Sequence, residues 1–571
     1  MAVDKNFAGT LAEAIMDRSD NACKSFREAR ATVISAFAGS MHSVGRDGRY
    51  YGSGQTNPDM YPLNLIYQLV NILTPALAMD VDVDITAKLP GGRPFARMFE
   101  AAMQYFVDDT DLHETGRLAM VDAFFGRGII ATGLGAKANG DFTDPGRYLM
   151  DPGKVGCRRV SENDFIIDMR ARHRDAIQFI GERMVVPFEW AMDSGLYDKK
   201  KVEKLRGSQV IREDAQKAYG SNVPDALVEQ IEIAEIYLPQ YGTIVTMPGD
   251  MTSGVGFLRE DEYVGPEHGP WRVLTYCDVP DSMEPIAPTQ AIYSLYQMVN
   301  KLAYAVKQRG LAARSFAVVE PGDEGTSKMV MNAKDGGVVY GKPKNVTSLK
   351  LGGVDQEAYT GVAFWQDQYN RIAQNPELAG GIAAQSGTLG QDKMLMSGVS
   401  AGLSDKQNRV RRFLSGVVQD MSWYVFDDDD VNGFKAELEF DFSGLRIPFE
   451  WEPGSREGKL QDYAMGVKAY PAGGNSPQER YEALRRWTSE MMPTLLNAGA
   501  AQGLTFDMEK LARWTLEPIG VTAADELVVP ATEETAPAEG GGVTIEEGNT
   551  NISAPTQTTA AIEPEGPTED A

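Results

Sequence analysis

Apolar residues recur at helical spacing in three long stretches between residues 288 and 425. In the first stretch they lie three and four positions apart over about four turns, which predicts an amphipathic helix from residue 288. The same spacing predicts a second helix that begins after an N-cap at Asp355 and ends before Pro376. A capping box of Ser404 and Gln407 predicts the start of a third. The third stripe consists of Val410, Phe413, Leu414, Val417, Val418, Met421, Tyr424 and Val425.

The segments between these helices have a different composition. Glu320–Gly353 is bounded by glycines and contains two strand-like runs, Lys328–Met331 and Gly337–Tyr340. Gly380–Gly402 is rich in glycine, alanine and serine, which predicts a loop. The sequence therefore predicts two helices that flank a small β-containing segment, followed by a loop and a third helix.

The amino-terminal part mixes helices with short strands. Leu63–Thr74 predicts an apolar helix that stops before Pro75, and Asp80–Thr86 alternates as a strand with Val81, Val83 and Ile85 on its buried side. Arg93–Phe125 predicts a helix that is broken near Asp108–Leu112. We therefore expect an α+β fold.

Further strands and helices are expected along the rest of the chain. An isoleucine-rich run at residues 231–236 is expected to pair with Gly242–Met247, and Lys435–Phe442 also alternates as a strand. Ser476, Pro477 and Glu479 predict the start of a carboxy-terminal helix. From about Ala531 the Thr/Glu/Pro/Gly/Ala composition predicts disorder.

The charge is strongly negative and unevenly distributed. The formal net charge is −26, and the eleven acidic residues after Val521, with no lysine or arginine, leave −15 on the rest. Such acidity argues against tight neutralisation of DNA phosphates as the main activity. A simple contribution to solubility explains the same charge.

Several chemical sites are not supported by the sequence. Gly398–Gly402 matches the nucleophile elbow around Ser400, but all four histidines precede it, whereas the hydrolase fold needs one after it. The three cysteines lie far apart and suggest neither disulfides nor a metal site. Aspartates at 80, 82 and 84, and at 427–430, fit solvated segments better than cation sites. We expect no catalytic residue, cofactor, metal or membrane span.

The order of these elements resembles the portal proteins of tailed bacteriophages, the ring-shaped connectors between head and tail. A strand with acidic and basic flanks at Glu162–Ala176 is similar to a recurrent portal segment, although Met169 stands where many relatives have proline. Gly269–Trp271 is similar to the strand that leads into the portal stem helix, and Asn300 lies at a recurrent position of that helix. The resemblance covers roughly residues 60–430 and rests on the order of the elements.

The resemblance implies a division into portal regions. They would be a wing (1–286 and 403–455, the latter a tunnel helix and strand), a first stem helix (287–314), a clip (315–353), a second stem helix (354–377), a tunnel loop (378–402), a helical crown (456–520) and a disordered acidic tail (521–571).

The same resemblance implies partners and candidate site residues. A portal is a ring of twelve copies in the virion, assembled in the host cytoplasm, that passes double-stranded DNA without sequence specificity. It binds the large terminase subunit, a tail adaptor, and the major capsid and scaffolding proteins. The candidates are Lys393, Gln391, Lys406 and Arg409 for the DNA channel; Lys342, Lys344 and Lys350 for docking at the clip; and Leu295, Val299, Leu302, Val362, Trp365 and Tyr369 for packing between stems.

A ring also follows from the two striped helices, because a lone helical hairpin cannot bury both flanks. Neighbouring copies in a closed assembly can cover them. Twelve copies would carry 12 × −26 = −312 charges, so the channel would repel DNA and favour sliding. Two alternatives remain open: another structural virion protein, such as a capsid or tail-tube subunit, and a serine hydrolase using Ser400.

Overall fold

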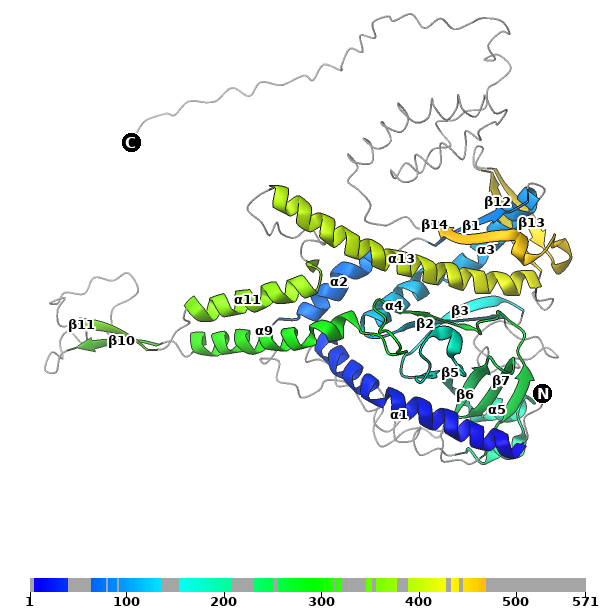
Figure 1. Cartoon of the computed structure of the whole chain (residues 1–571), viewed down its shortest axis with the longest axis horizontal. Helices are drawn as coiled ribbons and strands as arrows, with labels where there is room; N and C mark the ends of the chain where they lie inside the picture. The colour runs from blue at the N-terminus through cyan, green and yellow to red at the C-terminus, as the bar shows by residue number, and fades with distance from the viewer. Residues whose placement is uncertain are drawn as a thin grey trace, which may run out of the picture.

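The protein is an α+β chain with a broad body and a long projection (Figure 1). The projection consists of two helices that lie side by side and end in a pair of strands (Figure 1). The computed structural model describes residues 5–38, 63–78, 81–89, 92–134, 153–206, 230–249, 255–311, 314–319, 328, 346–351, 356–376, 389–427, 433–440 and 445–468. The predicted crown helices and acidic tail lie outside these residues.

The main hydrophobic core is built around α3 (Arg93–Asp109), α4 (Leu112–Phe124) and α13 (Leu389–Asp427). The predicted stripe of α13 is buried along its whole length, from Val410 to Val425. The predicted break between α3 and α4 is also confirmed. Asp111 there adopts a left-handed conformation with φ 47°, and its side chain accepts a hydrogen bond from the Glu114 N–H. Each helix can therefore turn its own apolar face toward α13.

Two pairs of antiparallel strands close one end of this core. β1 (Asp82–Ala87) pairs with β14 (Tyr463–Lys468), and β12 (Phe434–Phe440) pairs with β13 (Leu445–Trp451). Trp451 is fully buried, with its ring 5.6 Å from that of Phe99. Val81, Val83 and Ile85 are buried as the alternation predicted.

A three-stranded antiparallel sheet lies next to the core, in the order β3 (Val155–Val160), β2 (Gly128–Leu134) and β9 (Trp271–Leu274). Every residue of β2 is buried. Its first residue must be glycine, because a Cβ on Gly128 would lie 2.0 Å from the Ala119 carbonyl oxygen of α4. One face of the sheet contacts the main core, and the other contacts a separate cluster around Trp271 and Phe165.

A second, five-stranded antiparallel sheet runs β4 (Phe165–Ile167), β5 (Ile180–Pro187), β6 (Gln230–Leu238), β7 (Thr243–Pro248) and β8 (Arg259–Glu262). The predicted pairing of the isoleucine-rich strand with the following one is confirmed as β6–β7. Ile231 and Ile233 pack with α5 (Phe188–Asp193) and α6 (Lys199–Glu203), while Ile236 belongs to a cluster that includes Ile15 of α1. The two sheets are joined by buried Glu182, which accepts hydrogen bonds from Arg158 and from the Trp271 indole.

The long amino-terminal helix α1 (Lys5–Ala38) runs along the body and connects these clusters (Figure 1). Ile15 packs under the five-stranded sheet, whereas Val33 belongs to the main core. Between them, the Phe26 ring lies 5.2 Å from the Arg127 guanidinium carbon. Three short 3-10 turns complete the body: η5 (Arg174–Ala176), η8 (Pro453–Ser455) and η9 (Leu460–Asp462).

The projection consists of α9 (Pro288–Leu311), β10 (Arg314–Val319), β11 (Val346–Leu351) and α11 (Gln356–Ile372). The two strands pair in an antiparallel register, with Arg314 opposite Leu351. The strand-like runs expected at Lys328–Met331 and Gly337–Tyr340 fall almost entirely outside the described residues. The predicted β-containing tip between two helices is present. Its two strands, however, directly follow α9 and directly precede α11.

Two predicted helix ends are wrong. α2 (Leu65–Leu77) does not stop before Pro75, which is tolerated in the last turn because Ala78 still donates its N–H to the Thr74 carbonyl. α13 begins at Leu389, so the capping box at Ser404 does not start it, and residues 389–402 are helical. Good helix formers between the glycines, such as Met394 and Leu395, favour the helix over the predicted loop.

Candidate functional site

The α9–α11 hairpin is the most distinctive candidate site, because only its base is anchored in the body. The fully buried residues of α9 are Thr289, Ile292, Tyr296, Val299 and Asn300, which all lie at or before the middle of the helix. Those of α11 are Tyr369 and Asn370, near its end. Beyond Asn300 on α9 and before Tyr369 on α11, no residue is fully buried. The hairpin thus leaves the body after about half its length.

Polar side chains fasten the base of the hairpin to α2. The Asn300 amide accepts a hydrogen bond from the Leu63 N–H and donates one to the Leu63 carbonyl, both at 3.0 Å. The Tyr369 hydroxyl donates to the Leu65 carbonyl at 2.8 Å. Asn300 and Tyr369 are both buried, where water cannot reach them. Each hydrogen bond therefore gives a partner to polar groups that would otherwise have none. These contacts fix the direction in which the hairpin leaves the body.

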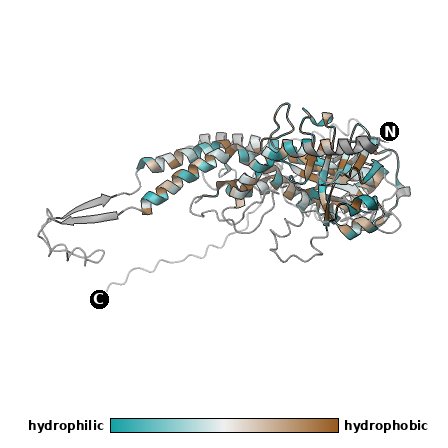
Figure 2. Cartoon of the chain, turned by 90° about the horizontal axis from the view of Figure 1, so that it is seen from below, coloured by the Kyte–Doolittle hydropathy of each residue, from teal (hydrophilic) through white to brown (hydrophobic). Residues whose placement is uncertain are grey.

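Large apolar side chains of the hairpin face solvent. In its distal part, Tyr359 and Phe364 of α11 each expose 55% of their surface, and Leu311 at the end of α9 exposes 71%. At the base, Met298 of α9 exposes 42% and Ile372 of α11 exposes 56%. Brown segments recur along both projecting helices in Figure 2, interleaved with teal ones. Exposed apolar surface of this kind is a candidate for contact with another protein.

The exposed aromatic residues of α11 lie on different sides of the helix. Tyr359 and Phe364 are five residues apart, which at 3.6 residues per turn places them about 140° apart around the axis. Helix α11 also packs on α9, and its half-buried residues Val362 and Trp365 lie outside the arc between the two rings. The two rings therefore stand at opposite edges of the exposed face of the helix, where a neighbour on each flank can contact one ring.

The predicted stem-packing residues divide into two groups. Val299 and Tyr369 are buried within this chain, at 0% and 1% exposure, so their assignment to packing between subunits is wrong. Both lie at the base, where the body covers them. The half-buried residues, which a neighbour can still contact, are Leu295, Leu302, Val362 and Trp365. Sequence reasoning missed Tyr359 and Phe364, because they fall outside the regular stripe. Two large aromatic residues on the polar side of a predicted helix were the signal that could have identified them.

Two of the four predicted DNA-channel residues are engaged inside the chain. The Lys406 ammonium donates a hydrogen bond to the Gln374 side chain, and burial lowers the pKa of Lys406. Arg409 pairs with Asp278 at 3.0 Å and with Asp405 at 3.4 Å. These contacts compete with a phosphate for both cations, and the DNA-channel assignments of Lys406 and Arg409 remain predictions. On the same helix, Arg411 and Arg412 are exposed and have no ion pair with any described residue.

For the remaining candidates, the structure describes at most the position of the backbone. Gln391 and Lys393 lie in the first turns of α13 and not in a loop, and their side chains are outside the described part. Lys350 is on β11, opposite Ser315 of β10. Lys342 and Lys344 lie outside the described residues. The clip and channel assignments of these residues therefore remain predictions.

The hydrolase alternative loses its structural basis. Ser400 lies inside α13, eleven residues after its start at Leu389, so no strand precedes it as a nucleophile elbow requires. Among the described residues there is no group of three histidine, cysteine or carboxylate side chains arranged to hold a metal ion. None of the helices in that part of the chain is both long and apolar enough to cross a membrane.

Comparison with known proteins adds no family to this picture. No protein-family model matches the chain, and the search of curated proteins finds no match. The hairpin and the order of the elements are the features that bear on function.

Proposed function

We propose that this chain is the subunit of a portal-type ring at one vertex of a tailed-phage capsid. The α9–α11 hairpin would be the stem, and its β10–β11 tip would be the clip that docks the terminase large subunit during packaging and a tail adaptor afterwards. The wing and crown would face the major capsid and scaffolding proteins. Double-stranded DNA would pass through the centre without sequence-specific contacts.

One observation carries this proposal: the distal hairpin has aromatic side chains on two flanks, and each remains more than half exposed among the described residues. Burying an exposed Phe or Tyr contributes about 1.5–3 kcal/mol. A neighbour on each flank gives a head-to-tail interface, which closes into a ring when the rotation between copies fits. The 24-residue α9 is about 36 Å long, so a ring of such hairpins encloses a channel of comparable depth.

The charge of the chain supports passage and not retention of DNA. Each copy has a formal net charge of −26, and Arg409 and Lys406 are occupied by contacts within the chain. A channel formed by subunits with this net charge repels DNA phosphates, so the duplex would move with little friction.

Electron microscopy of the purified full-length chain tests the proposal directly. We expect negative-stain images to show rings with a central hole, and native mass spectrometry to give one closed stoichiometry, with twelve copies expected from the portal resemblance. Monomers at high protein concentration, or open filaments, would contradict the proposal.

A further inference from the structure

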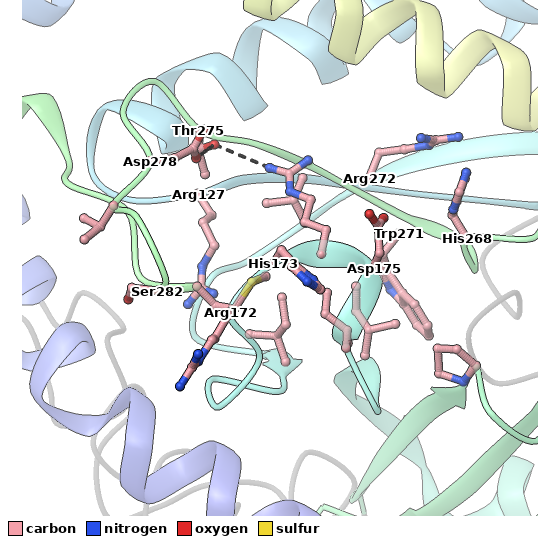
Figure 3. A pocket seen from close by; sticks show the side chains of 18 of the residues that line it. Arg127, Arg172, His173, Asp175, His268, Trp271, Arg272, Thr275, Asp278 and Ser282 are labelled. Atoms are coloured by element: carbon pink, nitrogen blue, oxygen red, sulfur yellow. Dashed lines mark hydrogen bonds between the residues drawn. The ribbon is translucent and has the colours of Figure 1, made fainter.

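A cavity lies in the body, away from the hairpin, where the two sheets meet (Figure 3). It has a volume of about 860 Å³, within the range of sites that hold small organic ligands. Strand β9 and the segments 172–180 and 278–283 form most of its wall. Part of that wall is apolar, contributed by Ile167, Ile177, Ile180, Val273, Val279 and Met283.

Two of the arginines that line this cavity already have partners. Arg127 is paired with Glu162 at 2.6 Å, and both side chains are almost completely buried. Arg272 forms two hydrogen bonds to Asp420, at 2.5 and 2.7 Å. These ion pairs hold the surrounding elements together, so they are not available to a ligand.

Arg174 differs from these arginines. Its guanidinium donates one long hydrogen bond, 3.4 Å, to the Thr275 hydroxyl, drawn as a dashed line in Figure 3. Within the described part of the chain, no carboxylate forms an ion pair with it. Arg172 and His173 also line the cavity, and their side chains are exposed and make no hydrogen bond or ion pair there. Three consecutive donors therefore border the cavity with spare hydrogen-bonding capacity.

The loop that carries these donors is held at both ends. The buried Asp168 carboxylate accepts hydrogen bonds from the Arg170 N–H at 3.1 Å and from the Gln178 N–H at 3.3 Å. One side chain thus spans the base of the loop and fixes it before any ligand arrives. Such preorganisation lowers the entropic cost of binding.

The electrostatic environment of Arg174 favours an added anion. Arg174 is exposed as a residue, but the surroundings of its guanidinium lower its pKa: partial desolvation contributes most, and the charges of Arg272, Arg127 and Arg409 act in the same direction, against the opposing effect of Asp278. A negative group beside Arg174 would relieve this repulsion. Asp175, Glu267 and Asp281 also line the cavity, so a strongly charged polymer is repelled and a small ligand with one anionic group is preferred.

We propose that this cavity binds a small organic phosphate, with the phosphate group on Arg174 and with Arg172 and His173 supplying further donors to the ligand from other parts of the wall. A phosphate has three terminal oxygens, enough to accept hydrogen bonds from several donors, whereas a carboxylate has two. The apolar wall would contact the organic part of the ligand. The site is separate from the hairpin, so its occupancy and ring formation can be measured independently.

Isothermal titration of the full-length protein with deoxyadenosine monophosphate tests this assignment. Deoxyadenosine, which lacks the phosphate, and inorganic phosphate, which lacks the organic part, are the two comparison ligands. Arg174→Gln removes the central donor. Arg170→Gln is the matched control, because this exposed arginine belongs to the same loop and its side chain does not line the cavity. Arg172→Gln is a second variant should Arg174→Gln fail to fold.

We expect the nucleotide to bind the wild type and the Arg170→Gln protein equally, and to bind Arg174→Gln or Arg172→Gln about tenfold or more weakly. Deoxyadenosine should bind far more weakly than its monophosphate. Inorganic phosphate could also bind as tightly as the nucleotide, with the same dependence on Arg174. The ligand would then be the free phosphate ion, and the assignment of a phosphate-binding site would still hold. No binding of either phosphate at about 10 mM, or equal losses in Arg174→Gln and Arg170→Gln, would overturn the proposal.

Discussion

Helix α13 and the α9–α11 hairpin carry similar apolar patterns, but they bury them in different ways. From Val410 to Val425 the stripe of α13 is covered by helices and strands of its own chain. In the hairpin, burial stops near Asn300 and Tyr369, and large apolar residues beyond that point face solvent. Periodicity therefore predicts that a stripe must be covered, without predicting which chain covers it.

The contrast separates two kinds of stability. α13 is a structural element of the free chain, and the distal hairpin becomes fully packed only when another molecule covers it. Helices that lack tertiary packing are marginal in water. Substitutions in α13 should therefore act on unfolding of the chain, whereas substitutions in the distal hairpin should act on assembly.

The largest effect is expected from Leu414→Ala in α13. Leu414 is fully buried, and its side chain packs so closely on α4 that a Cβ at Gly116 would lie 2.9 Å from it. Truncation leaves a cavity and should lower the free energy of unfolding by about 2–5 kcal/mol. Chemical denaturation followed by circular dichroism measures this change. A loss below about 1 kcal/mol would show that the core around α13 is loosely packed.

The second prediction concerns the double variant Tyr359→Gln/Phe364→Gln. Because both rings are more than half exposed, the unfolding free energy of the free chain should change by less than about 0.5 kcal/mol. Assembly should nevertheless fail, because each copy loses aromatic contacts on both flanks. Analytical ultracentrifugation should show rings for the wild type and monomers for the variant.

A matched control for that variant is available in the body. Tyr241→Gln/Val264→Gln removes an exposed tyrosine and an exposed aliphatic residue near the five-stranded sheet, at 45% and 62% exposure. This protein should still form rings. If the control and the hairpin variant assemble equally well or equally badly, the hairpin is not the surface that holds the assembly.

Local pattern made several elements predictable from the sequence. The alternation at Val83 and Ile85 and the spacing of the α13 stripe each reflect a single face that must be buried, and the structure confirms both. The break between α3 and α4 was visible for a similar reason, since residues 108–111 interrupt the helical pattern. Each of these features depends only on neighbours in the sequence.

Features that depend on distant residues were not predictable. Asp420 meets Arg272 across 148 positions, and Asn300 meets Leu63 across 237. Nothing in the local sequence of either residue identifies its partner. The same limit explains the error at Val299, assigned to a subunit interface: it is buried by parts of the chain that only the tertiary fold brings near. It also explains why the ion pair of Arg409 with Asp278 was not foreseen.

The smallest predicted effect tests a polar contact of α13, the ion pair between Arg409 and Asp278. Burial acts to raise the pKa of Asp278, but hydrogen bonds from Thr275 and Arg409 and the charges of Arg409 and Arg174 outweigh it, so the pKa lies below its ordinary value of 3.8. A carboxyl group with a lowered pKa in the folded state stabilises the protein fully above its unfolded pKa. This contribution is lost as the pH falls through the lower, folded value.

Asp278→Asn should therefore reduce the unfolding free energy at neutral pH and have no effect in strong acid, where the wild-type carboxyl is also uncharged. The Asp278 side chain is 59% exposed, so water and salt screen the pair, and the loss should be at most about 1 kcal/mol. Unfolding free energies of both proteins, measured at neutral pH and below pH 3.8, give the difference. Asp281→Asn in the same loop, whose carboxylate has no ion pair with a described residue, should show no such pH-dependent loss. A loss of several kcal/mol in Asp278→Asn would instead mean that polar contacts, as much as the apolar stripe, hold α13 in the body.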